Sequence, residues 1–235
     1  MVRVRVMAAV LALTACHSGS GPVAAPTTPP TTPPTSEATF AVPPVLTATP
    51  THVTPTTARP APRYAFPVRG CRATYGHSHH DYPAADVFAA KGCAYVSPVA
   101  GRVDEVTYTD TWNGATNRGA DRGGLSVSVV GVDGVRYYGS HLSAIAPGIR
   151  PGVAVTAGTR LGSVGNTGSA RGIATHVHFG ISWPTRNGVW WVRRGEVYPW
   201  PYLDAWRGGT AKSPAAAVAA RHKVSGDVPR CTSYC

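Results

Sequence analysis

The sequence predicts an all-β fold, built mainly from antiparallel strands with long loops. The chain of 235 residues contains 26 glycines and 22 prolines, which punctuate short apolar stretches rich in Val and Tyr. It holds only three glutamates, and no run reads as a long amphipathic helix. The segment Val132-Asp133-Gly134-Val135 is typical of a tight hairpin, because Asp-Gly tolerates the positive φ that such turns need. Together these features favour strands packed around one core.

The expected strands are the short apolar stretches that glycines separate from one another. In chain order they cover residues 95–96, 101–109, 125–132, 135–140, 160–164, 176–182 and 189–192. Residues 132–135 join the third and fourth of these as a hairpin. Beyond Gly208 the chain becomes Ala-rich and basic, and there we expect a short helix followed by a small disulfide loop.

The first 16 residues predict export. Arg3 and Arg5 precede an apolar run over residues 6–13, which is too short to cross a bilayer as a mature helix. The ending Leu13-Thr14-Ala15-Cys16 resembles a bacterial lipobox, in which Cys16 becomes an acylated first residue. Ordinary signal cleavage that discards Cys16 is the alternative. We favour a lipid anchor on Cys16, which would hold the protein at the outer face of the membrane or in the cell wall.

Composition divides the remaining chain into three parts. Residues 17–63 are Pro, Thr and Ala repeats that cannot bury a core, so we expect an extended tether. Residues 64–207 form the globular domain, and residues 208–235 are the basic tail. The net charge of +11 suits an anionic envelope polymer. The arginines are scattered and no nucleic-acid motif is present, so we expect no nucleic-acid partner, and we expect a monomer.

The other four cysteines predict disulfides, because an even number is typical of exported chains. The simplest pairing is Cys71 with Cys93 and Cys231 with Cys235. A cysteine zinc site is the competing interpretation, but the closely spaced pairs typical of such sites are missing.

Histidines and one aspartate predict a metal site. His176-Val177-His178 places two imidazoles on one face of a strand, because alternate side chains share a face. Asp86 follows a group of histidines in HHDYPAADVFA. Two imidazoles and one carboxylate suit zinc better than calcium or magnesium, and three protein ligands leave a position for water.

Hydrolysis at such a site also needs a general base, and the glutamates lie far from the histidine motifs in the sequence. There is no HExxH motif, and Glu37, Glu105 and Glu196 are all distant. We therefore expect a histidine to act as the base, with His141 and His176 as the candidates.

Four segments resemble a known family when they are taken in order. These are DVFAAKGCAYVSPVAGRV, YYGSHLS, LGSVGNTGSARG and THVHFGIS, and the closing WWVRRGEVYPWPYLDAW resembles the actinobacterial branch. The chain is similar over residues 66–206 to the lysostaphin-like (LytM-type) zinc endopeptidases, which cleave peptidoglycan cross-links. The resemblance implies a β-sheet groove of the duplicated-hybrid-motif type, with one Zn²⁺ at its floor. It also implies peptidoglycan stem peptides or cross-bridges as substrates.

The resemblance implies a role for each matching position. His80, Asp86 and His178 are the expected zinc ligands, and His141 and His176 are the expected catalytic pair. Five residues separate His80 from Asp86 where the family has three, so His79 is an alternative ligand. His77 with Asp81 also satisfies the shorter spacing, although the segment after Asp86 keeps the family spacing.

Two further departures from the family concern the strand that carries His178. Thr175 replaces a common proline before this strand, and Gly180 replaces a common glutamate. Either change can alter how the ligands are oriented.

Two other functions remain open beside the endopeptidase. The chain could be a catalytically silent peptidoglycan-binding or regulatory module of the same fold. It could also be a structural lipoprotein whose zinc has a fourth protein ligand, supplied by a spare His77 or His79. The tryptophans near the end of the domain either line the groove or close a small core, and core packing is the favoured interpretation.

Overall fold

A computed structural model describes residues 61–235 of the chain. The predicted signal sequence, Cys16 and nearly all of the predicted tether lie outside these residues. Within them, no helix is long and apolar enough to span a membrane.

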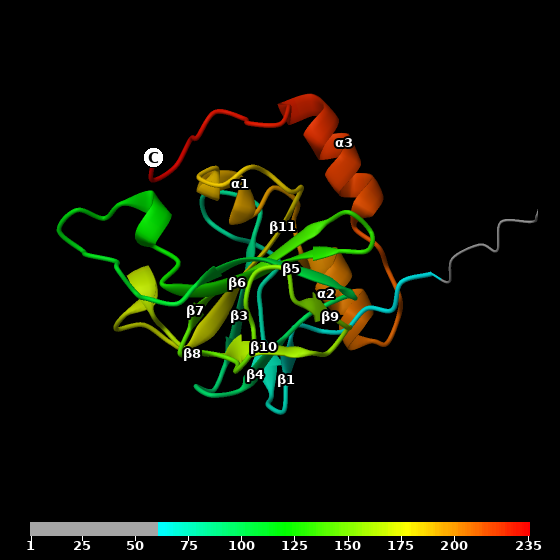
Figure 1. The fold of residues 1–235 in the computed structure, drawn as a ribbon, viewed down its shortest axis with the longest axis horizontal. Helices are drawn as coiled ribbons and strands as arrows, with labels where there is room; N and C mark the ends of the chain where they lie inside the picture. Colours follow the sequence, from blue (N-terminus) through cyan, green and yellow to red (C-terminus); the bar gives the residue numbers. More distant parts are fainter. Residues whose placement is uncertain (1–60) are drawn as a thin grey trace, which may run out of the picture. The chain divides into compact units, whose positions relative to one another are not determined.

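The described residues form two antiparallel β-sheets with three α-helices and two short 3-10 helices (Figure 1). The four-stranded sheet has the order β1-β4-β10-β8, and the seven-stranded sheet has the order β2-β3-β11-β7-β6-β5-β9. The strands are β1 (Val68–Arg69), β2 (Ala73–Thr74), β3 (Ala85–Ala89), β4 (Ala94–Val96), β5 (Gly101–Thr107), β6 (Leu125–Gly131), β7 (Arg136–Leu142), β8 (Ala144–Ile145), β9 (Ala154–Val155), β10 (Arg160–Ser163) and β11 (His176–Ser182). The helices are α1 (Trp190–Arg193), α2 (Trp200–Arg207), α3 (Ala215–Ser225), η1 (Gly119–Asp121) and η2 (Gly168–Ala170). The predicted fold class, mainly antiparallel β with long loops, is confirmed.

The core lies against one face of the seven-stranded sheet. Val177, Phe179 and Ile181 of β11 project to this face because alternate residues of a strand point the same way. The ring of Tyr95 in β4 packs against the backbone of Gly139 in β7, so the smaller sheet covers part of the face. Each such large apolar side chain contributes about 1.5–3 kcal/mol when it is fully buried. The opposite face of β11 is left for the polar site.

Helix α2 packs on the same face. The Trp206 ring lies edge-on to Tyr137, with ring centroids 6.1 Å apart, and edge-on to Phe179 at 6.4 Å. Pro199 comes just before α2, where a proline costs no hydrogen bond. Trp206 and Trp183 are therefore core residues, as the favoured interpretation of the tryptophans predicted.

The strand prediction succeeds for six of the seven ranges and is wrong for residues 189–192. The first six coincide with β4, β5, β6, β7, β10 and β11, with shifts of one or two residues at their ends. Residues 190–193 instead form α1, whose helical turn is closed by a hydrogen bond from Arg194 N to Trp190 O of 3.3 Å. A four-residue apolar run has no periodicity that separates a buried strand from a turn of helix.

Both predicted disulfides are present, Cys71–Cys93 and Cys231–Cys235. The predicted tail helix is α3, and the second disulfide closes the loop that follows it. The tail packs on the domain, because Val218 joins the core and Trp183 donates a hydrogen bond to Asp227 O at 3.1 Å.

Candidate metal centre

Three neighbouring strands carry the site. In β11, His178 lies opposite Asp86 of β3 on one side and opposite Ser140 of β7 on the other. His176 and His178 point to the face away from the core because Val177 between them is buried in the core. The predicted shared face of the H-x-H pair follows directly from this pairing.

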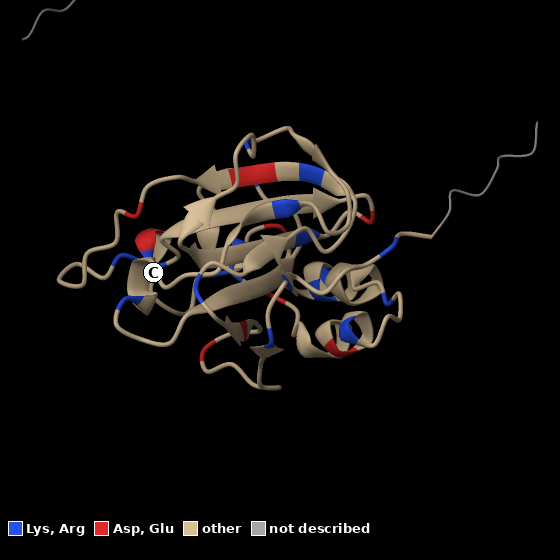
Figure 2. Ribbon diagram, turned by 90° about the horizontal axis from the view of Figure 1, so that it is seen from below, with Lys and Arg blue, Asp and Glu red and all other residues tan. Residues whose placement is uncertain are grey.

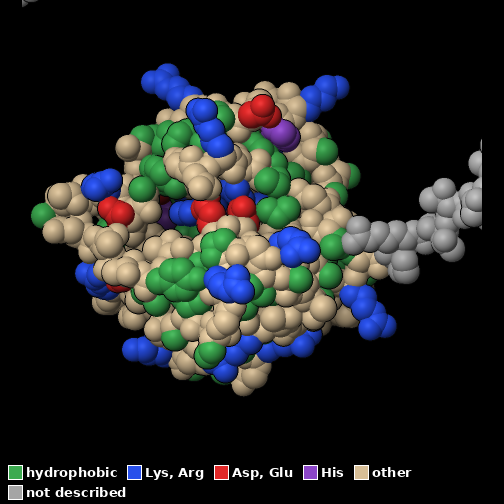
Figure 3. Space-filling model, viewed as in Figure 1, with side chains coloured by type: hydrophobic (Ala, Val, Ile, Leu, Met, Phe, Trp, Pro, Cys, Tyr) green, Lys and Arg blue, Asp and Glu red, His purple; other side chains and the backbone are tan. Residues whose placement is uncertain are grey.

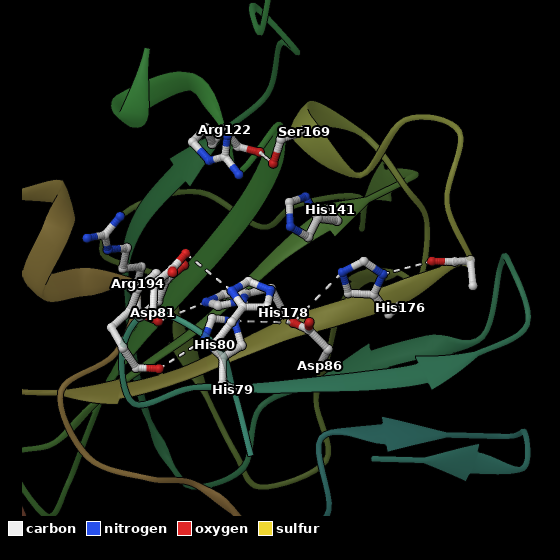
Figure 4. Close-up of polar contacts among 12 residues, drawn as sticks. His79, His80, Asp81, Asp86, Arg122, His141, Ser169, His176, His178 and Arg194 are labelled. Atoms are coloured by element: carbon white, nitrogen blue, oxygen red, sulfur yellow. Dashed lines mark hydrogen bonds and ion pairs between the residues drawn. The ribbon is translucent and has the colours of Figure 1, made fainter. Parts of the chain in front are cut away.

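His79, Asp86 and His178 form a cluster whose potential ligand atoms all lie within 4.8 Å of one another. Asp86 Oδ1 is 3.1 Å from His178 Nδ1 and 4.0 Å from His79 Nε2. Ligands held about 2.0–2.1 Å from a tetrahedral zinc lie about 3.3 Å apart, so the Asp86–His178 spacing fits such a centre. Figure 4 shows these side chains converging between β3 and β11.

His80, the ligand favoured from the sequence, lies outside this cluster. Its side chain is 72% exposed, and its Nδ1 is 3.2 Å from Asp81 Oδ2. The side chain of His79 is only 4% exposed and turns inward, so the structure favours the alternative ligand. His77 is also directed elsewhere, with its Nε2 3.1 Å from Asp204 Oδ2.

Each of the two clustered histidines has one ring nitrogen held by a backbone carbonyl. His79 Nδ1 lies 2.9 Å from Tyr82 O, and His178 Nε2 lies 2.9 Å from Arg194 O. A carbonyl only accepts hydrogen bonds, so each of these nitrogens is the N–H donor. The other nitrogen, Nε2 of His79 and Nδ1 of His178, then offers its lone pair to the centre, as metal-binding histidines usually do.

The donor set fits a cation. A neutral His178 with its proton on Nε2 points the Nδ1 lone pair at the carboxylate of Asp86, and two acceptors at 3.1 Å repel each other unless a cation lies between them. Two imidazole nitrogens and one carboxylate oxygen form a mixed donor set that suits zinc. Among the described residues the cluster holds three ligands, which leaves a fourth position open.

His141 and His176, the predicted catalytic pair, lie next to this cluster. Their ring centroids are 4.9 Å apart, and both residues are buried. His141 Nδ1 is 2.8 Å from Thr167 O, and His176 Nδ1 is 2.8 Å from Ala174 O. By the same reasoning both rings carry their proton on Nδ1 and leave Nε2 free as an acceptor.

A β-bulge turns His141 toward the site. In the pairing of β6 with β7, two steps along β6, from Val127 to Leu125, match three steps along β7, from Gly139 to Leu142. The extra residue breaks the alternation, and His141 has a φ of 63°. Ser140 and His141 therefore both line the cavity, although regular alternation would send them to opposite faces.

The electrostatics of the site favour a neutral His79, a neutral His141 and an ionised Asp86. Burial, and then the nearby His178, lower the pKa of His79 to about 4. Burial, and then His178 and His176, lower the pKa of His141 to about 3. Burial by itself raises the pKa of Asp86, but the adjacent His178 and the other surrounding histidines outweigh burial and lower it.

The two family departures on β11 have structural explanations. A Cβ on Gly180 would lie 2.3 Å from Arg194 O, the carbonyl that holds His178. A larger residue at position 180 therefore cannot fit, and the backbone of Arg194 occupies its place. Thr175 donates a hydrogen bond to Ala89 O at 2.7 Å, which ties the start of β11 to the end of β3.

The cavity around the centre has a second set of lining residues. Trp190 is one of them, so for this tryptophan the alternative interpretation, a groove residue, holds. The others, which were not expected from the sequence, are aromatic and basic side chains: Tyr82, Tyr138, Arg122, Arg193 and Arg194. Figure 3 shows a hollowed region at which basic, acidic and histidine side chains are visible. Elsewhere the Lys and Arg positions are spread over many strands, helices and loops rather than gathered in one element (Figure 2). Neither Glu105 nor Glu196 lines the cavity, as expected from the sequence.

Comparisons with known proteins identify structures of similar architecture. No protein-family model and no curated protein matches the chain. The catalytic domain of lysostaphin from Staphylococcus simulans is 22% identical, with a TM-score of 0.43, and the match covers 56% of this chain and 92% of that domain. LytM from Ruminococcus gnavus is 21% identical, with a TM-score of 0.48, and the match covers 65% and 63% of the two chains.

A third similar structure is the catalytic domain of a mutant form of the prophage-encoded M23 protein EnpA from Enterococcus faecalis. It is 23% identical, with a TM-score of 0.38, over 55% of this chain and 90% of that domain. The chain spans 54% of the length of full-length lysostaphin. Because the identities and TM-scores are low, function has to be inferred from the site itself.

Proposed function

We propose that this protein is a zinc-dependent endopeptidase that hydrolyses peptide cross-links of peptidoglycan. The observation that carries the proposal is the three-ligand cluster beside two buried histidines with free Nε2 atoms. A structural zinc site is normally closed by four protein ligands, whereas hydrolytic zinc sites keep one position open. The motif resemblance described above supports peptidoglycan peptides as the substrate class.

We assign the metal ligands as His79, Asp86 and His178. The hydrogen bonds to Tyr82 O and Arg194 O would hold the imidazoles in the tautomer and orientation that the metal needs. When bound, zinc supplies a Lewis acid that polarises the cleaved carbonyl and acidifies a water molecule.

His141 and His176 would carry out the proton transfers. The carbonyls of Thr167 and Ala174 fix the Nδ1 protons, so Nε2 of either ring is the atom that accepts a proton from the attacking water. Once protonated, that Nε2–H can donate to the oxyanion or to the leaving amine. Burial lowers the pKa of His141 to about 3, which keeps this ring neutral and its Nε2 unprotonated at neutral pH.

The remaining expectations belong to the same proposal. We propose that the protein is exported, anchored by a lipid on Cys16, extended from the membrane by residues 17–63 and active as a monomer. Such an anchor would place the domain next to its substrate.

The test is to incubate the protein with purified peptidoglycan and identify the released fragments by mass spectrometry. We expect new amino termini at the cross-links, loss of release after chelation and recovery on adding zinc. His141→Ala should abolish release while zinc remains bound. If the wild-type protein binds zinc but releases no fragments from peptidoglycan, the silent binding module is favoured instead.

A further inference from the structure

The cavity that holds the metal centre has a basic side. Arg122, Arg193 and Arg194 line it, whereas Asp86, a proposed metal ligand, is the only acidic residue of the described chain that lines it. Arg193 is neutralised by an ion pair with Glu105. Over residues 61–235, neither Arg122 nor Arg194 forms an ion pair. The cavity therefore carries two uncompensated positive charges beside the metal centre.

Arg194 is held in place without a carboxylate. It is 9% exposed, its guanidinium carbon lies 4.0 Å from the centre of the Tyr82 ring, and one amino group donates to Ser233 O at 2.8 Å. Its Nε is buried and has no hydrogen-bond partner among residues 61–235.

The two acidic residues whose charges act on Arg194 are already paired with other groups. Asp81 lies against His80, with 3.2 Å between Oδ2 and Nδ1, and Glu196 is 3.1 Å from the guanidinium of Arg221. Neither lines the cavity. The charge of Arg194 is therefore left available to a ligand.

Arg122 is fixed in a similar way. Its guanidinium carbon lies 3.7 Å from the centre of the Tyr234 ring, and NH1 donates to Asn117 Oδ1 at 2.6 Å. A guanidinium has five N–H donors in a planar fork, so most of them remain free. Figure 4 shows Arg122 and Arg194 across the cluster from His176. Two fixed, unpaired guanidinium groups at one end of a cavity suit a carboxylate, which the fork binds with two parallel hydrogen bonds.

The distance between Arg194 and the metal centre limits where that carboxylate can lie in the substrate. One aromatic ring separates Arg194 from the centre, since the Tyr82 ring is 5.7 Å from the His178 ring and 4.0 Å from the guanidinium carbon. An extended peptide advances roughly 3.3–3.6 Å per residue. A carboxylate within about three residues of the cleaved bond therefore reaches the arginines.

We infer that Arg122 and Arg194 form a carboxylate-binding subsite, so that the preferred substrates are peptides with a free carboxylate within about three residues of the cleaved bond. This inference rests on the proposed peptidase function for its catalytic part only, since carboxylate binding is measurable without cleavage.

The binding test compares two probes that differ in one group. These are diacetyl-Lys-D-Ala-D-Ala with a free carboxylate and the same peptide as its carboxamide. Each is titrated calorimetrically into the metal-free full chain at low and at physiological salt. We expect the acid to bind at least about tenfold more tightly than the amide, because hydrogen bonds to charged groups contribute about 1.5–3 kcal/mol. Equal affinities would overturn the inference.

Variants then assign the preference to the two arginines. Arg122→Gln and Arg194→Gln should each bring the ratio of acid to amide affinity toward one, and Arg122→Lys should keep part of it because it retains the charge. Arg118→Gln is the matched control, because Arg118 is exposed, belongs to the same loop and does not line the cavity. It should keep the ratio. An equal loss in the control would mean that net charge, and not a subsite, causes the preference.

Cleavage of the same two peptides by the zinc-loaded full chain separates the two proposals. A higher kcat/KM for the acid supports both. Cleavage of both peptides at equal kcat/KM overturns the subsite and keeps the peptidase. If the acid binds more tightly, but neither peptide nor purified peptidoglycan is cleaved, the proposed function fails and the subsite stands.

Discussion

Replacing His79 with alanine tests the metal centre most directly, because His80 next to it provides a matched control. The two side chains differ in exposure, 4% for His79 and 72% for His80, and only His79 belongs to the cluster with Asp86 and His178. Loss of a residue that merely orients a ligand lowers metal affinity 10–100-fold. Loss of the His79 ligand should therefore lower zinc affinity at least about 100-fold, whereas His80→Ala should change it less than about threefold.

The effect can be followed as zinc-dependent stabilisation. At a free zinc concentration about 100 times the wild-type Kd, the ion stabilises the folded chain by about 2.7 kcal/mol. If the affinity of His79→Ala is about 100-fold lower, the same concentration contributes only about 0.4 kcal/mol. For a chain of this size about 1 kcal/mol shifts Tm by about 2–4 °C. Zinc should therefore raise Tm by about 5–10 °C in the wild type and in His80→Ala, and by about 1 °C in His79→Ala.

Each variant is compared with its own metal-free form by scanning calorimetry, so that any loss of packing at His79 cancels. Zinc content after dialysis, measured by atomic emission, gives a second readout. A zinc-dependent shift that survives in His79→Ala but disappears in His80→Ala would refute the assignment and restore His80 as the ligand. A shift that survives in both would refute a metal site in this loop.

Three further changes test the surroundings of the centre. Gly180→Ala would push a Cβ against Arg194 O, and we expect unfolding free energy to fall by about 1–3 kcal/mol, from denaturant titration, and zinc affinity to fall about 10–100-fold. Asp104→Asn leaves the buried charge of Arg136 without its 2.8 Å partner, and we expect a loss of about 3 kcal/mol in the same assay; no loss would show that Arg136 is not held by this pair. The pKa of His141 is lowered from 6.5 to about 3 by burial, so below pH 6.5 the unfolded chain binds a proton that the folded chain does not. The metal-free protein should therefore lose stability as pH falls from 7.5 to 5, and His141→Gln should lose less; identical pH slopes would contradict the buried neutral histidine.

The parts of the site that local periodicity controls could be predicted from the sequence. Alternation along a strand places His176 and His178 on one face whatever the neighbouring strands are, and the structure confirms this. The sequence also contains a signal for β3. In β3, Ala85, Val87 and Ala89 are buried and alternate with Asp86, so the predicted ligand already lay in a strand pattern.

The choice between His79 and His80 could not be made from the sequence, because residues 75–84 form a loop without periodicity. Consecutive residues of a loop can point in any direction, and here hydrogen bonds within the loop decide which histidine faces the cluster. His79 Nδ1 binds Tyr82 O, which turns the ring inward, while His80 pairs with Asp81 at the surface. The orientation of His141 depends on a bulge between β6 and β7, and a bulge arises from strand pairing rather than from one strand alone.

The helical turn α1 explains two departures from expectation. These are the strand wrongly predicted at residues 189–192 and the glycine at position 180. Because residues 190–193 form the helical turn α1, the chain leaves it with Arg194 O directed at β11, where the carbonyl accepts the hydrogen bond of His178 Nε2. That carbonyl lies 2.3 Å from where a Cβ of residue 180 would be, so only glycine fits there. A glutamate side chain at position 180 and the carbonyl of Arg194 therefore cannot both occupy this space. Arg194 also places its guanidinium on the basic side of the cavity. One residue therefore orients the proposed zinc ligand His178 through its carbonyl and contributes to the proposed carboxylate subsite through its side chain.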